Sequence, residues 1–199
     1  MNEESFAPIK VNSRLNKAVF FDRDGTIIQH VDLMHSVQDL RLLPGVSSAI
    51  RELNRNGFLV IVITNQPVVA RGMVDEKEID AIHAALINRL KKKGARIDVV
   101  HFCPHHPKAN LKKYRVRCRC RKPAPGMILR ASKQLKIDIK KSFMVGDALI
   151  DIVAGKKSGL KTILVKTGPG HARLDKKYKN IKPDFEVKDL RQAVQIIER

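Results

Sequence analysis

Tryptophan is absent from this chain, and aromatic residues of all kinds make up only 5% of its 199 residues. Proteins that bind single-stranded nucleic acid without sequence preference stack the bases on aromatic side chains. The sequence therefore offers little of such a stacking platform. It also contains no internal repeat and no low-complexity tract, and 43% of its residues are hydrophobic, which is enough for a real core.

Long hydrophobic runs are missing as well. The longest apolar stretch, from Phe58 to Ile63, is far too short to span a bilayer. The first ten residues, MNEESFAPIK, are polar and include no apolar core of signal-peptide length. We therefore expect a cytoplasmic protein without a membrane partner. Its length suits one domain, and we expect this domain to be a monomer.

Acidic residues are scarce. The chain has 20 of them against 39 lysines and arginines, which gives a net charge of +19 and an isoelectric point near 10.2. From Lys91 to Lys141 there are 17 basic residues against only Asp98 and Asp138. Such a surplus fits either a solvated, lysine-rich surface or a partner that is a polyanion, such as nucleic acid. We favour the solvated surface and keep nucleic acid as the alternative.

Two carboxylates follow an apolar run near the start of the chain. The run Ala18–Phe21 leads directly into Asp22-Arg23-Asp24-Gly25-Thr26. Because side chains alternate along an extended segment, we expect Asp22 and Asp24 to point to one side and Arg23 to point away. Such a pair can hold a metal ion, with one acid attacking phosphorus and the other exchanging a proton with the leaving group. The alternative is an ordinary acidic turn after a strand.

Short apolar runs alternate with segments of helical periodicity along the chain. The apolar runs predict strands at residues 18–21, 58–63, 97–102, 142–145, 162–165 and 184–187. Helices are expected at residues 44–57, 75–90, 126–135, 148–157 and 190–197. This alternation predicts an α/β fold with a doubly wound parallel sheet, in which ligands bind at the carboxyl ends of the strands. Asp22, Asp24, Thr64 and Asp147 all follow or end a predicted strand.

These polar residues form an ordered series that resembles the haloacid dehalogenase-like hydrolases. The series consists of Asp22 with Asp24, Thr64-Asn65, Lys122-Pro123 and Gly146-Asp147 with Asp151. The resemblance implies a Rossmannoid phosphatase domain over residues 1–199, with a core at about 17–168, a zinc loop at about 102–123 and a closing strand and helix at 184–199. It also implies that Asp22 attacks phosphorus to form an aspartyl phosphate, while Asp24 acts as general acid and base.

The same resemblance implies the remaining parts of the site. Mg²⁺ would be held by the carboxylates of Asp22 and Asp147 and by the backbone carbonyl of Asp24. Thr64, Asn65, Gln66, Arg121 and Lys122 would bind the phosphate and the rest of the substrate. For Asp151, four residues after Asp147, two interpretations stay open. It either supports the site from behind or favours the start of a helix.

All three cysteines lie in one loop. Cys103, His105, Cys118 and Cys120 provide three thiolates and one imidazole, a set that suits a closed tetrahedral zinc site. A disulfide is the alternative, but three cysteines leave one unpaired, and a bond between Cys118 and Cys120 would be strained. His101 and His106 are competing ligands, and the Cys-Pro-His spacing favours His105.

The loop narrows the resemblance to the heptose bisphosphate phosphatases and their relatives, the histidinol-phosphate phosphatases. Twelve residues separate His105 from Cys118, as in the heptose group, and the loop leads into Arg121. This implies a role in carbohydrate metabolism, with hydrolysis of D-glycero-D-manno-heptose 1,7-bisphosphate at position 7. Histidinol-phosphate phosphatase, polynucleotide end phosphatase and a basic, zinc-containing nucleic-acid-binding protein are the alternatives.

The chain departs from the heptose pattern at several positions, which are Ile28, Leu33-Met34, Pro67-Val68 and Ala148. None of them belongs to the phosphoryl-transfer set. All lie where the remainder of the substrate would be recognised. The reaction class is therefore better supported than the substrate.

Overall fold

A computed structural model of the protein describes residues 15–172, 178 and 180–199. The polar decapeptide at the N-terminus lies outside the described residues. Among those that are described, no helix is both long and apolar enough to cross a membrane.

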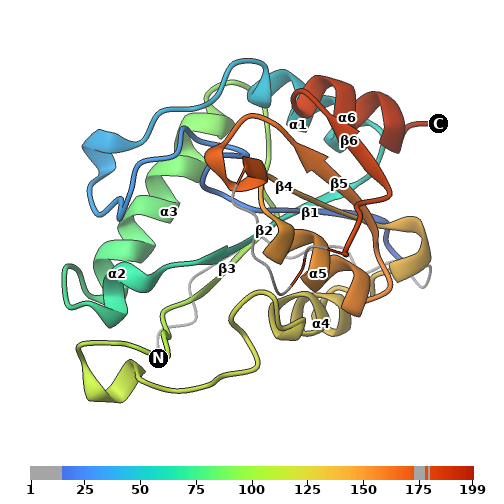
Figure 1. Ribbon diagram of the computed structural model, residues 1–199. Helices are drawn as coiled ribbons and strands as arrows, with labels where there is room; N and C mark the ends of the chain where they lie inside the picture. Colours follow the sequence, from blue (N-terminus) through green and yellow to red (C-terminus); the bar gives the residue numbers. More distant parts are fainter. Residues whose placement is uncertain (1–14, 173–177, 179) are drawn as a thin grey trace.

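A parallel sheet of six strands forms the centre of the fold (Figure 1). Its strands, in the order β3-β2-β1-β4-β5-β6, are β3 Val99–Cys103, β2 Leu59–Asn65, β1 Ala18–Phe21, β4 Phe143–Gly146, β5 Lys161–Val165 and β6 Phe185–Val187. All neighbouring strands run in parallel. From β1 the chain adds β2 and then β3 on one side, and afterwards adds β4, β5 and β6 on the other side. The strand order therefore reverses between β1 and β4, which is where ligands bind in doubly wound sheets.

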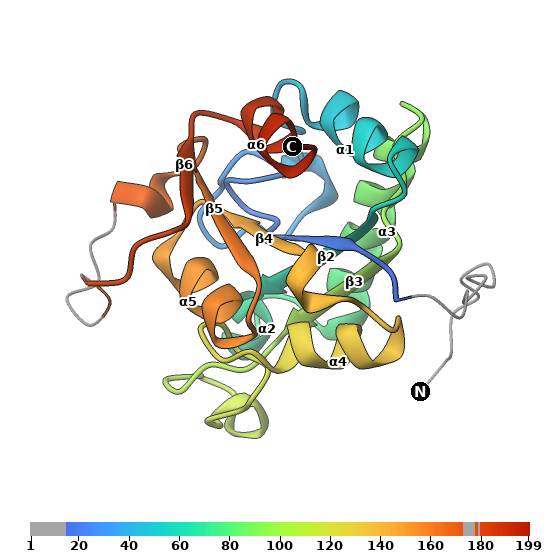
Figure 2. The same ribbon diagram turned by 90° about the vertical axis from the view of Figure 1, so that its right-hand side faces the viewer.

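Helices cover both faces of the sheet (Figure 2). They are α1 Val46–Arg55, α2 Pro67–Ala70, α3 Glu76–Lys91, α4 Gly126–Gln134, α5 Leu149–Lys157 and α6 Leu190–Ile197. One apolar core joins α1, α3 and α6 to one face, and a second joins α4 and part of α5 to the other. Side chains of β1 alternate between these cores, with Val19 and Phe21 in the first and Ala18 and Phe20 in the second. Burial on both faces explains why this strand is continuously apolar.

Most predicted elements are confirmed, with shifted ends. The expected strand from Phe58 to Ile63 instead covers Leu59–Asn65, so Thr64 and Asn65 are its last residues. A capping box begins α3, with hydrogen bonds from the Glu78 amide to Asp75 Oδ1 (2.8 Å) and from the Asp75 amide to Glu78 Oε2 (2.7 Å). The helix α2 was not predicted, because its four apolar residues carry too little periodicity to indicate a helix.

The segment between β3 and α4, which contains Cys118 and Cys120, projects from the body of the fold beside α2 (Figures 1 and 2). The backbone amides of Asn110 and Leu111 both donate to the carbonyl of Ala70, at 3.1 Å. Tyr114 donates its hydroxyl to Glu76 Oε1 at 2.7 Å. These contacts fasten the loop to α2 and to the first turn of α3.

Candidate active site

The carboxyl ends of β1, β2 and β4 surround a cavity of about 390 Å³. Asp22 and Asp24 enter it from the end of β1, Thr64 from β2, and Asp147 from the residue after β4. The amide of Asp22 donates to the carbonyl of Val145 at 3.0 Å, so the parallel pairing continues one residue beyond the strand. The structure thus places these four predicted residues around one cavity.

Lys122 lies buried at the base of this cavity. Its Nζ is 2.6 Å from Asp22 Oδ1 and 2.7 Å from Asp151 Oδ1, and it donates to the carbonyl of Ile63 at 2.8 Å. Burial opposes the charge of the lysine, but Asp151 and Asp22 outweigh this cost and raise the pKa of Lys122. The ammonium group therefore stays charged and holds Asp22 in place.

Asp151 fits both interpretations that the sequence left open. Its Oδ1 contacts Lys122, and its Oδ2 accepts a hydrogen bond from the amide of Ala148 at 3.1 Å, at the start of α5. Its side chain is fully buried. The residue thus orients Lys122 from behind the cavity while it caps a helix.

Three carboxylates crowd together next to the lysine. Ligand oxygens of Asp22, Asp147 and Asp151 lie within 4.8 Å of one another. Burial raises the pKa of Asp22 to about 7 and that of Asp147 to about 6, with neighbouring carboxylates adding to the effect. Closely spaced carboxylate oxygens are the ligands that a hard divalent cation such as Mg²⁺ prefers, and its charge would relieve their repulsion. The donor set therefore fits magnesium.

A glycine makes room for this carboxylate group. Gly25 has a positive φ of 78°, which L-residues rarely adopt. A Cβ atom there would lie 2.6 Å from Asp147 Oδ2. The same oxygen accepts a hydrogen bond from the amide of Gly170 at 2.9 Å. Glycine at position 25 thus lets the turn after β1 approach Asp147 closely.

Arg23 corrects one of the predictions. We expected it to point away from the carboxylate pair, but its guanidinium donates to Asp24 Oδ1 at 3.0 Å and to Asp24 Oδ2 at 3.2 Å. The residue is only 1% exposed. It also donates to Gln66 Oε1 at 2.9 Å, and it lies 3.2 Å from Nε2 of His83.

His83 was not among the predicted site residues. The residue lies on the buried face of α3, in the same helical series as Ile79, Ile82 and Leu86. A histidine within an apolar series is a signal for a buried polar partner. That partner, Arg23, is 60 residues away in the chain, so the sequence pattern alone does not identify it.

The side chains of Asn65 and Gln66 form hydrogen bonds with other residues of the site. The side chain of Asn65 exchanges two hydrogen bonds with the backbone amide and carbonyl of Lys122, both at 3.0 Å. Gln66 donates to Asp24 Oδ2 at 2.9 Å and to Thr64 Oγ1 at 2.8 Å. Their side chains therefore fix the lysine segment and the second aspartate.

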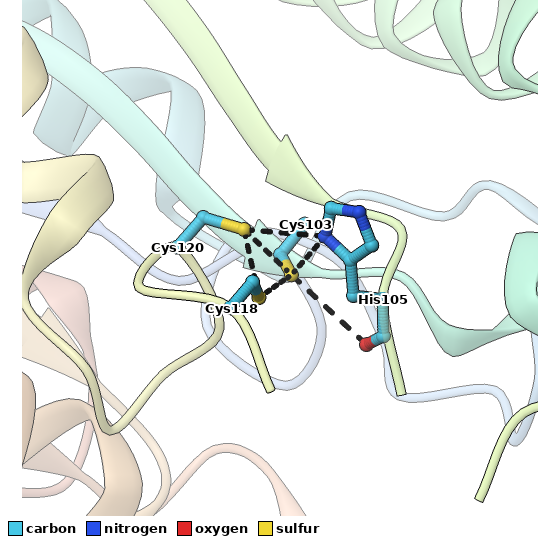
Figure 3. A group of neighbouring side chains, drawn as sticks. All are labelled: Cys103, His105, Cys118 and Cys120. Carbon is cyan, nitrogen blue, oxygen red and sulfur yellow. Dashed lines mark hydrogen bonds between the residues drawn. The ribbon is translucent and has the colours of Figure 1, made fainter. Parts of the chain in front are cut away.

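The four predicted zinc ligands converge on one point (Figure 3). Sγ of Cys120 lies 3.0 Å from that of Cys118 and 3.1 Å from that of Cys103, and 3.4 Å from Nδ1 of His105. The cysteines are free thiols. Burial raises the pKa of Cys103 and of Cys120, because a thiolate is poorly solvated there, and a neighbouring cysteine adds to the effect.

A zinc ion fits this group. Zinc–sulfur bonds of ~2.3 Å in tetrahedral geometry separate thiolates by roughly 3.7 Å, which the cluster reaches by opening slightly. Neither competing histidine belongs to the cluster. His101 lies within β3, and His106 accepts a hydrogen bond from the amide of Lys108.

Arg121 links the thiol cluster to the cavity. It donates a hydrogen bond to the carbonyl of His105 at 3.0 Å and also lines the cavity. The cavity lining also includes several of the positions at which the chain departs from the heptose pattern, namely Leu33, Met34, Pro67, Val68 and Ala148. The cavity therefore combines a charged group of side chains with an apolar part of the lining.

Comparisons with known proteins agree with this geometry. A family model described as HAD-hydrolase-like matches residues 119–193. The D-glycero-beta-D-manno-heptose-1,7-bisphosphate 7-phosphatase of Rhodopseudomonas palustris is 46% identical over 143 residues, which cover 72% of this chain and 79% of the relative. The enzyme of the same name from Escherichia coli K12 is 39% identical, covering 76% and 80%.

Solved structures give the same picture. The D,D-heptose 1,7-bisphosphate phosphatase of B. bronchiseptica, complexed with magnesium and phosphate, superposes with a TM-score of 0.79 at 30% identity, covering 92% of this chain and 98% of that one. A HAD-like phosphatase from Mesorhizobium loti, described as putative in its own structure, gives a TM-score of 0.81 at 32% identity, covering 96% and 90%.

Proposed function

Since this chain belongs to the D-glycero-beta-D-manno-heptose-1,7-bisphosphate 7-phosphatase family of HAD-like hydrolases, and is thus a phosphoric monoester hydrolase, we propose that it cleaves the 7-phosphate of D-glycero-D-manno-heptose 1,7-bisphosphate. The observation that carries the proposal is the group at the base of the cavity. There a buried lysine bridges Asp22 and Asp151 while Asp147 lies within reach of both acids.

The proposed reaction has two steps. A carboxylate oxygen of Asp22 attacks phosphorus, the ester P–O bond breaks, and Asp24 gives a proton to the departing alkoxide. A water molecule then attacks phosphorus of the aspartyl phosphate and loses a proton to Asp24. The bond between phosphorus and Asp22 breaks, inorganic phosphate leaves, and both carboxyl groups return to their starting state.

Lys122 and Thr64 serve the transferred group. Lys122 is close enough to Asp22 to contact a phosphoryl oxygen bound next to that carboxylate. The hydroxyl of Thr64, at the end of β2, lines the same cavity. Asn65 and Gln66 act indirectly, through the hydrogen bonds that fix Lys122 and Asp24.

Two metal ions complete the proposal. Asp22 and Asp147, with the backbone carbonyl of Asp24, would hold Mg²⁺, which when bound offsets the negative charge shared by the nucleophile and the phosphate. The three cysteines and His105 would hold a structural Zn²⁺. Structural zinc supplies folding free energy to a loop that buries little apolar surface, so its role here is to order the segment that carries Arg121.

Arg121 is the group proposed to bind the second phosphate. Among the cavity-lining cations, Lys122 is occupied by Asp22 and Asp151, and Arg23 by Asp24, Gln66 and His83. Arg121 spends one N–H on the carbonyl of His105. Because Arg121 also lines the cavity, we assign its remaining N–H groups to the distal phosphate.

A phosphate-release screen tests the proposal. The protein is assayed with Mg²⁺ on heptose 1,7-bisphosphate, on histidinol phosphate and on a 3′-phosphorylated oligonucleotide. We expect the highest kcat/KM on the bisphosphate, with the phosphate on C7 released. A higher kcat/KM on either of the other two esters would overturn the substrate and keep the chemistry.

A further inference from the structure

The general acid proposed for this site is held by a buried arginine next to it in the chain. The guanidinium of Arg23 contacts both carboxylate oxygens of Asp24, at 3.0 and 3.2 Å, while the arginine itself is only 1% exposed. The Asp24 side chain is 19% exposed and faces the cavity. Solvent therefore reaches the carboxylate of Asp24 but not the guanidinium of Arg23 that binds it.

Gln66 also binds Asp24. Its side-chain nitrogen donates to Asp24 Oδ2 at 2.9 Å, and its side-chain oxygen accepts from Arg23 at 2.9 Å. The three side chains thus form a closed ring of hydrogen bonds. A ring of this kind leaves the carboxylate few alternative rotamers, because each rotation would break more than one bond.

His83 supports the ring from α3. Its Nε2 lies 3.2 Å from Nη1 of Arg23, and since guanidinium nitrogens only donate, Nε2 acts as the acceptor. Burial and the arginine charge lower the pKa of His83 to about 3, so the imidazole stays neutral. The imidazole packs against Phe102, with the ring centroids 5.4 Å apart. The histidine therefore fixes the far side of the guanidinium.

We propose that Arg23, Gln66 and His83 form a positioning network that sets the orientation of Asp24 for proton transfer, so that a helix covering the sheet controls the general acid. The inference rests on the proposed function, because it assigns Asp24 that role. Proton transfer needs the acid within hydrogen-bond reach of the leaving oxygen, and a displacement of about 1 Å can cost up to ~10²-fold in rate. His83 contacts no substrate and acts only through Arg23.

A purely structural role for these residues predicts a different result. A buried ion pair that only stabilised the fold would, when weakened, reduce the amount of active protein and lower the rates on all substrates equally. A positioning network matters most when the leaving group needs a proton. Comparing substrates whose leaving groups do and do not need a proton therefore distinguishes a positioning role from a purely structural one.

The test uses two phosphate esters with the intact, Mg²⁺-loaded protein. One is an alkyl phosphate, glycerol 3-phosphate or the heptose bisphosphate, whose alkoxide needs a proton. The other is p-nitrophenyl phosphate, whose nitrophenolate leaves without one. Values of kcat/KM report the first irreversible step, which is the departure of the leaving group. The ratio of the two values within one preparation does not depend on the fraction of folded protein.

The variants are His83→Leu, which removes the acceptor, and His83→Gln, which keeps an acceptor at similar reach. His101→Leu, on β3 and outside the network, is the matched control. We expect His83→Leu to lower kcat/KM for the alkyl ester by roughly 10- to 100-fold and for the aryl ester by less than about threefold. His83→Gln should recover most of the loss, and the control should leave the ratio unchanged.

Equal losses on both esters in His83→Leu would overturn the network and leave the phosphatase proposal standing. The same holds if glutamine gives no recovery of the ratio. Failure of the wild-type protein to hydrolyse both the heptose bisphosphate and the aryl ester with Mg²⁺ would instead overturn the proposed function, and the network with it.

Discussion

Two clusters of possible metal ligands lie in this molecule, and they are built in different ways. Asp22 and Asp147 directly follow buried strands, Asp151 lies in the first turn of α5, and the ammonium group of Lys122 contacts both Asp22 and Asp151. Cys103 ends β3, whereas Cys118 and Cys120 belong to the projecting loop and meet Cys103 and His105 there. The first cluster is held by the sheet and α5, whereas we propose that zinc orders the loop that carries most of the second.

The two clusters meet at one short segment. Arg121 follows the thiol cluster and is tied to its histidine by a hydrogen bond to the carbonyl of His105. Lys122 is tied instead to the sheet side, by Asn65, Ile63 and the two aspartates. With the roles proposed for Arg121 and Lys122, chemistry and substrate recognition would be anchored separately, although adjacent residues carry them.

The largest expected effect comes from the carboxylate cluster. Asp22→Asn keeps the shape of the side chain but removes the attacking anion, so kcat should fall at least about 10³-fold. Circular dichroism should show an unchanged fold, and Asp39→Asn, outside the cavity, serves as the control. A variant with near-normal turnover would remove Asp22 from the reaction.

The thiol cluster should respond in structure rather than in chemistry. Purified protein should carry about one equivalent of zinc, and Cys118→Ser should lower this content. Hydrogen exchange should then rise across residues 102–121 more than in the sheet. His106→Ala, next to the cluster but outside it, should keep the zinc. If zinc-free protein kept the loop protected from hydrogen exchange, zinc would not be what orders the loop.

The junction between the clusters gives an intermediate effect. Arg121→Ala should lower kcat/KM for the bisphosphate by roughly 10- to 100-fold and for an alkyl monophosphate by only a few fold, because only the first substrate has a distal phosphate. The exposed Arg119 provides the control substitution, Arg119→Ala. If both substrates lost equally, Arg121 would belong to the chemistry instead.

The smallest effect concerns pH. The raised pKa values of Asp22 (about 7) and Asp147 (about 6) mean that the folded protein holds protons which the unfolded chain releases near pH 4. Without metal, this part of the stability is present at low pH and is lost as pH rises to about 7. Mg²⁺ replaces those protons, so its stabilising increment should grow between pH 5 and 8, by roughly 1–3 kcal/mol.

His83 contributes with the opposite sign, because its lowered pKa removes stability as pH falls. That contribution is present with and without Mg²⁺ and cancels in the increment. Thermal unfolding at several pH values, with and without Mg²⁺, measures the increment directly. An increment that stayed constant with pH would show that protons and the metal do not compete for these carboxylates.

Much of this arrangement could be predicted from the sequence. Strands buried on both faces produce continuous apolar runs, so the sheet and the place of Asp22, Thr64 and Asp147 at its edge followed from simple patterns. The cysteine and histidine spacing likewise indicated which ligands gather.

Other features could not be predicted, because they join residues far apart in the chain. The contact of Arg23 with His83 spans 60 positions. Lys122 lies 100 positions from Asp22, and only the family resemblance placed the two residues at one site. The helix α2 is too short to show a period. Alternation along the strand placed Arg23 away from Asp24, but a long side chain can turn back to a neighbouring carboxylate once burial makes an unpaired charge costly.

The division of labour between the two clusters is tested most directly by one measurement on zinc-depleted protein, such as Cys118→Ser, supplied with Mg²⁺. Its kcat/KM is determined in parallel for p-nitrophenyl phosphate and for heptose 1,7-bisphosphate. We expect the aryl ester to be hydrolysed within a few fold of the wild-type value, while the bisphosphate loses roughly tenfold or more. Equal losses on the two esters, or no loss on either, would contradict the separate anchoring of chemistry and recognition.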